Sequence, residues 1–280
     1  MRYRTLAWLP VIVAAALLGV ELAMGPTPAR GAVLRGEVEV AKVFWLASAV
    51  AAALVFERGD YLRRAWLLLG ASSASFLVRD ATLLSFVDES AGTSLAVVRG
   101  VIVVLGNVAQ VGGIWALSRV WTAAGLEDHD ERSRWQARTL LGGAVVLSLG
   151  IMGPSLFHDA TSLGTGNLEA LPHLASDLGD AICFILIGRL VRVALALRGG
   201  IVSWTWTLFA ASQISWMLFD GARTLTELYG ATASTPPLVE CLRVVGAGYL
   251  CAAGVAQRWV VVGRNVAKPA PGEASAGRGR

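Results

Sequence analysis

Long apolar stretches separated by short polar connections run through the whole chain. Because a bilayer core of about 30 Å requires roughly 20 apolar residues per helix, eight segments are expected to span a membrane. Turn-forming stretches such as GPTPARG, DESAGT, GTGN and STPP separate several of them. The pattern predicts an all-α, polytopic membrane protein with eight transmembrane helices, at residues 5–24, 41–57, 64–87, 94–118, 138–157, 174–193, 202–227 and 237–262.

The composition supports this class. Of the 280 residues 55% are hydrophobic and only 16% are charged, and the mean hydropathy is +0.60. A soluble domain of this length does not enclose so much apolar surface. The net charge of +4 is small and the basic residues form no single block, which argues against a nucleic-acid partner. Three cysteines without CxxC spacing predict neither a disulfide framework nor a zinc site.

The positions of Lys and Arg predict the orientation, because these residues resist translocation. With a cytoplasmic N-terminus, the inner segments hold 17 basic residues, whereas the outer connections hold only Arg30, Arg35 and Lys42. This bias favours eight spans in the plasma membrane with both termini in the cytoplasm. An alternative interpretation treats residues 1–20 as a cleaved signal peptide, and the internal repeat argues against that removal.

The two halves of the chain are similar in sequence. WLLLGASSASFLVRD at 66–80 aligns with WTLFAASQISWMLFD at 206–220 at an offset of 140, and Arg99 aligns with Arg243 at an offset of 144. Chance similarity between apolar helices is the alternative explanation, and the second and sixth spans do not align. We expect a parallel repeat of two four-helix units, with a charged linker and a disordered tail; the respective bounds are 1–125, 138–265, 126–137 and 266–280.

Charges inside the spans mark the candidate site. Asp80 and Arg99 flank a short hairpin at the same depth, about 10 Å below the outer end of their helices. Asp220 and Arg243 repeat this arrangement. Because an isolated charge in hydrocarbon costs on the order of 3 kcal/mol, such residues turn inward and pair. The sequence therefore predicts two ion pairs, Asp80 with Arg99 and Asp220 with Arg243.

Further charges at the same level complete a charged layer: Arg79, Arg223, Glu240, Asp177 and Asp180. The layer forms either a pocket open to the outside or a structural lock between helices. His158 and His173 flank the outer loop after the fifth span, but two histidines without a third ligand in register do not predict a metal or haem site.

The chain contains no HExxH motif, no nucleotide-binding loop and no lysine in its last spans for a retinal Schiff base. No cofactor is expected. We expect a non-enzymatic sensing, binding or accessory module, whose partners are the lipid bilayer and either a small ligand or an extracytoplasmic or membrane protein. A transporter that uses the interface between the repeats is the alternative, and an intramembrane enzyme is a further one.

Overall fold

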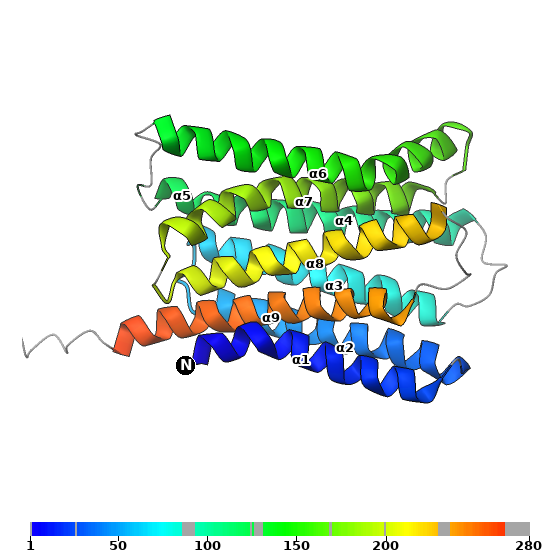
Figure 1. Ribbon diagram of the computed structural model, residues 1–280, viewed down its shortest axis with the longest axis horizontal. Helices are drawn as coiled ribbons and strands as arrows, with labels where there is room; N and C mark the ends of the chain where they lie inside the picture. The colour runs from blue at the N-terminus through cyan, green and yellow to red at the C-terminus, as the bar shows by residue number, and fades with distance from the viewer. Residues whose placement is uncertain are drawn as a thin grey trace, which may run out of the picture.

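The computed structural model describes residues 2–25, 27–85, 93–123, 125, 131–167, 170–198, 200–228 and 236–266. Within these residues the chain is helical and contains no strand, which confirms the all-α prediction (Figure 1). Eight long helices and the four-residue α5 follow one another in the order α1 (Arg2–Met24), α2 (Pro28–Ala53), α3 (Tyr61–Ser85), α4 (Thr93–Ser118), α5 (Val120–Ala123), α6 (Glu131–Gly164), α7 (Ala170–Ala196), α8 (Ser203–Leu228) and α9 (Pro237–Val266).

Four helices in the described part of the chain are long and apolar enough to cross a membrane. These segments are Tyr3–Met24 in α1, Val97–Ser118 in α4, Arg134–Gly164 in α6 and Pro237–Gly263 in α9. They are consistent with a membrane protein. The other long helices, α2, α3, α7 and α8, are of similar length but contain no described segment that is apolar enough by the same measure.

Helix α2 is longer at its start than the sequence predicts. The predicted span began at residue 41, and residues 28–40 were assigned to a connection because Arg30, Arg35 and two glutamates interrupt the apolar run. In the structure this segment is helical from Pro28 onwards. Proline suits the first helical turn, where its missing N–H group is not needed for a hydrogen bond. As a result Lys42 lies in mid-helix and not in a connection.

The predicted linker is also partly helical, because α6 begins at Glu131. Residues 126–130 of the linker lie outside the described residues, and so do residues 267–280 of the predicted tail.

Six of the long helices form a ring. α2 packs against α3, α3 against α4, α4 against α7, α7 against α8, and α8 against α9, and a contact between α9 and α2 closes the ring. α1 lies outside the ring on α9, and α6 lies outside it on α7 (Figure 1). Some helices approach each other closely at glycine positions. An added Cβ at Gly254, for example, would lie 2.9 Å from the carbonyl oxygen of Ser48. Small residues allow such close approach of helices in a membrane.

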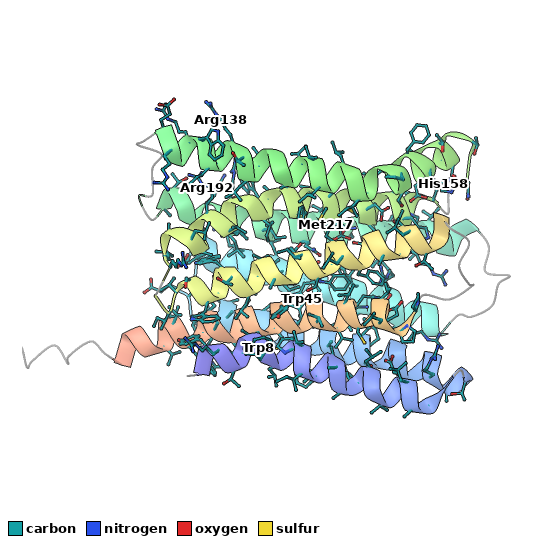
Figure 2. The ribbon with its side chains drawn as sticks, in the orientation of Figure 1. Trp8, Trp45, Arg138, His158, Arg192 and Met217 are labelled. Atoms are coloured by element: carbon teal, nitrogen blue, oxygen red, sulfur yellow. The ribbon has the colours of Figure 1, made fainter. Side chains whose placement is uncertain are left out.

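The start of α1 and the end of α9 lie at the same end of the bundle (Figure 1). Arg138 and Arg192 lie toward this end, whereas His158 lies toward the opposite end, where the turn between α1 and α2 is also found (Figure 2). Below we call the two ends of the bundle the terminal end and the α1–α2 end.

Candidate functional site

A charged cavity of about 240 Å³ lies inside the ring, and residues from all six ring helices line it. Its described lining includes six of the nine charged residues that the sequence singled out: Arg79, Asp180, Asp220, Arg223, Glu240 and Arg243. The remaining predicted residues, Asp80, Asp177 and Arg99, lie outside this lining. The charged layer thus surrounds a space between the two halves of the chain.

Lys42 is the most buried basic side chain at the cavity, with 2% of its surface exposed. Its Nζ donates a hydrogen bond of 2.7 Å to Oε1 of Glu39, one turn earlier on α2, and another to Oδ2 of Asp80 on α3. The Nε of Arg79 donates to the other oxygen of Asp80 at 2.6 Å. Asp80 therefore binds two cations, and its carboxylate links α2 to α3.

The predicted pair between Asp80 and Arg99 is wrong, because the carboxylate of Asp80 binds Lys42 and Arg79 instead. Arg99 lies on α4, and its buried Nε has no hydrogen-bond partner within the described residues. The prediction fails because the apolar pattern places Lys42 in a connection, where it is no candidate partner for Asp80. A lysine side chain in a helix extends toward the helix N-terminus, and this brings its ammonium group to the level of Asp80.

The predicted pair between Asp220 and Arg243 is also wrong. Arg243 donates a hydrogen bond of 3.0 Å to Glu240, which lies three residues earlier on the same face of α9. Its guanidinium group lies 5.2 Å from the ring centre of Phe219. Asp220 forms no ion pair within the described residues, and its buried Oδ2 has no hydrogen-bond partner there. Equal depth places two groups at one level but does not fix their direction around the helix axis.

The charged layer continues beyond the cavity toward α6. Asp177 accepts a hydrogen bond from the hydroxyl of Ser155 on α6. Arg223 lies with its Nη2 3.3 Å from Nδ1 of His173. A surface depression between these groups includes both His158 and His173. In the part of the chain that the structure describes, no three His, Cys, Asp or Glu side chains group together in a way that could hold a metal ion.

Sequence reasoning missed several residues of the lining. Two polar examples are Lys42 on α2 and Gln110 on α4. Gln110 also accepts a hydrogen bond of 3.2 Å from the hydroxyl of Ser72. A glutamine in the apolar run of α4 was the available signal. The indole ring of Trp216 was missed as well. It lies against Gly246, where an added Cβ would come within 2.9 Å of the indole Nε1.

The charges around the cavity are unevenly paired. Each of the four basic side chains in the lining has a partner: Lys42 and Arg79 bind Asp80, Arg243 binds Glu240, and Arg223 contacts His173. By contrast, Asp180 and Asp220 form no ion pair within the described residues. Asp180 and Asp220 are therefore the acids of the described lining without a cation at ion-pair distance, and the arginines act on them only from farther away. Carboxylates beside the rings of Trp45 and Trp216 are groups that bind an organic cation.

No protein-family model, no curated protein and no solved structure matches this chain.

Proposed function

We propose that this protein is an eight-span plasma-membrane protein that binds a small solute carrying an ammonium group in the charged cavity, as a non-enzymatic binding or sensing module. The observation that carries the proposal is that two acids, Asp180 and Asp220, form no ion pair within the described residues and line a cavity to which all six ring helices contribute. A buried carboxylate without a partner is costly. A bound ammonium group would supply the missing charge and hydrogen-bond donors.

The size and lining of the cavity favour an amine or amino acid. Its volume of about 240 Å³ is below the usual range of about 300–1,000 Å³ for ligand pockets, so the solute has few non-hydrogen atoms. The faces of Trp45 and Trp216 suit the ammonium group. Arg223 and Arg243 line the same cavity, and a guanidinium group that binds one partner keeps further N–H donors for the carboxylate of a zwitterion.

Eight spans are supported by the way in which the ring buries charge. The four helices without a sufficiently apolar segment, α2, α3, α7 and α8, each carry charged side chains inside the bundle, namely Lys42, Asp80, Asp180 and Asp220. These side chains lie at the cavity or at its ion pairs. Because the ring removes them from the lipid-facing surface, all eight long helices are suited to a bilayer.

The proposed orientation places the terminal end in the cytoplasm. Arg138 and Arg192 lie toward this end (Figure 2), as expected if basic residues remain on the cytoplasmic side. Since Lys42 belongs to the charged layer and not to a connection, Arg30 and Arg35 are the basic residues left in the first outer segment. The charge bias on which the orientation rests is therefore stronger than the sequence count indicated.

A duplication is supported by corresponding contacts. Gly106 lies against Phe76, and Gly246 lies against Trp216; both members of the second contact follow those of the first by 140 residues. The order of packing in α2, α3 and α4 is also that in α7, α8 and α9. The outer helices differ, because α1 packs on α9 whereas α6 packs on α7. The duplicated unit is best supported for the six ring helices.

Thermal unfolding of the full chain in lipid nanodiscs tests the binding proposal. Ethanolamine, glycine and alanine are the probes, and acetate is the anionic control. A ligand at 100 times its Kd stabilises the folded state by about 2.7 kcal/mol. We expect at least one amine to stabilise the wild-type chain and acetate not to stabilise it. The stabilisation by the amine should be lost in Asp220→Asn and retained in Glu57→Gln, whose side chain is exposed in the wild-type chain. Stabilisation by acetate alone would contradict a cation site.

Transport is the second candidate, because the cavity lies between the halves of the chain, where duplicated carriers bind their solutes. Flux of the bound amine into proteoliposomes distinguishes the two functions. Flux that is lost in Asp220→Asn and retained in Glu57→Gln supports a carrier. Binding without flux supports a sensing or accessory role.

A further inference from the structure

A second acidic group lies outside the charged cavity, where α1, α2 and α9 meet. Glu21 belongs to the apolar segment Tyr3–Met24 of α1 and has 0% of its surface exposed. Neither of its carboxyl oxygens has a hydrogen-bond partner within the described residues. The carboxyl group of Glu37 on α2 lies against it, and Oε2 of Glu37 is also buried without a partner there.

The groups around this pair do not supply enough positive charge to balance two ionised carboxylates. Arg30 on α2 and Glu240 on α9 are near enough to act on Glu21 electrostatically, and Cys241 on α9 lies beside the same acids. Glu240 is already bound to Arg243. Arg30 forms no ion pair with either glutamate within the described residues. Because Arg243 already binds Glu240, Arg30 is the cation among these groups that acts on Glu21, and it does so from a distance.

Two carboxylates in contact within a membrane cannot both remain ionised without a cation between them, because repulsion and desolvation add. A protonated carboxyl group donates a hydrogen bond to its ionised neighbour. A single proton therefore removes one charge and satisfies two of the orphan oxygens. Calcium would require six to eight oxygen ligands, and the described residues contain no group of three or more acidic, His or Cys side chains suited to a metal.

We propose that Glu21 and Glu37 form a proton-binding site in which one proton is shared between the two carboxyl groups. The site does not depend on the solute assigned to the charged cavity. It does lie next to that cavity, because Glu240 is close to Glu21 and forms the ion pair with Arg243 in the cavity lining. Loss of the proton would add a negative charge beside this ion pair.

The structure also provides a route for a hydrophobic reagent. Glu37 is the acidic residue in the described lining of an apolar groove of about 740 Å³, which runs between α1 and α2 over the surface of α9. Leu17, Val40 and Val244 are among the apolar residues of the groove. Dicyclohexylcarbodiimide partitions into such surfaces and reacts with a protonated carboxyl group. The acid adds across one C=N bond, and rearrangement leaves a stable N-acylurea on the glutamate.

Two measurements on the full chain in nanodiscs test the proposal. In infrared spectra at neutral pH we expect the C=O stretch of a protonated carboxylic acid. It is lost in Glu21→Gln and in Glu37→Gln, since a glutamine amide donates the hydrogen bond that the proton supplied. The band remains in Glu57→Gln. In the wild-type chain we expect one carbodiimide adduct, mapped by peptide mass spectrometry to Glu21 or Glu37, whose yield falls as the pH is raised.

Several results would overturn the proposal. A wild-type spectrum without the band shows that no proton is held. A band that persists in Glu37→Gln but is lost in Glu21→Gln shows that Glu21 is protonated alone and that the site is not shared. A band that persists in both variants comes from another buried acid and contradicts the assignment. A band that grows when sodium in the buffer is replaced by choline shows a metal cation between the carboxylates. The labelling of the wild-type chain does not depend on whether the variants fold, and an adduct confined to other residues contradicts the assignment.

Discussion

Replacing Asp80 with asparagine removes the carboxylate that binds both Lys42 and Arg79. Lys42 is then left in the bundle with 2% of its surface exposed and with Glu39, at 2.7 Å, as its remaining anionic partner. Breaking a buried ion pair by removing one partner costs about 3–5 kcal/mol. Because Lys42 keeps Glu39, we expect the lower end of this range, about 3 kcal/mol, for Asp80→Asn.

Lys42→Met removes the positive partner of the same ion pair. It should lower the free energy of unfolding by less than Asp80→Asn does, because Asp80 retains Arg79 at 2.6 Å. In the double variant Arg79 has lost Asp80 and Glu39 has lost Lys42, but no buried lysine is left facing a missing carboxylate. The two changes should therefore destabilise the protein by less than the sum of the single effects, with a coupling energy of about 2 kcal/mol. The free energy of unfolding is measured by denaturant titration in mixed micelles, with tryptophan fluorescence as the signal.

A second cycle, with Asp80→Asn and Arg99→Gln, distinguishes the observed pairing from the one that the sequence predicted. Arg99 forms no ion pair with Asp80 within the described residues, so these two changes should add to within about 0.5 kcal/mol. Two results would refute the placement of α2 against α3. One is a coupling energy between Asp80 and Lys42 below about 0.5 kcal/mol, and the other is a coupling energy between Asp80 and Arg99 as large as that between Asp80 and Lys42.

Two further predictions concern packing and orientation. Gly254→Ala should cost about 1–3 kcal/mol, because its Cβ would lie 2.9 Å from the backbone oxygen of Ser48; Gly150→Ala, with nothing within 4 Å of its Cβ, is the matched control and should not destabilise the helix. Equal costs would contradict the contact. In a chain without native cysteines, a membrane-impermeant maleimide added to cells should label Thr165→Cys and not Arg58→Cys, both exposed positions. The reverse labelling would overturn the orientation.

Hydropathy predicted one segment for each of the eight long helices, because apolar stretches are separated by turn-forming residues. The ends were less predictable. The predicted boundary at residue 41 stood thirteen residues after the first residue of α2, Pro28. Charged residues at 30, 35, 37 and 39 interrupt the apolar run, but in a helix they are distributed around its circumference. Glu37 and Glu39 are only partly exposed, and Val38 between them is buried.

The sequence predicts the depth of the candidate site along the helices, because each residue of a helix advances it by 1.5 Å. Six of the nine proposed residues line one cavity for this reason. The ion-pair partners did not follow, because they depend on the rotation of each helix and on a third helix. The contact of Gly246 with Trp216 resembles that of Gly106 with Phe76 at an offset of 140 residues, whereas the sequence alignment of Arg99 with Arg243 has an offset of 144. The difference is about one helical turn, which apolar sequences specify poorly.

The cost of the charged layer is itself an argument for a function. Well-packed apolar residues usually replace a buried ion pair without loss of stability, so the packing of the ring helices does not require these charges. A structural lock would need pairs in which every charge is matched. Lys42 and Asp80 meet that requirement, but Asp180 and Asp220 do not. Acids without an ion-pair partner in a membrane protein are understandable if a ligand binds them. Asp220→Asn is therefore a better variant than Asp80→Asn for separating binding from stability.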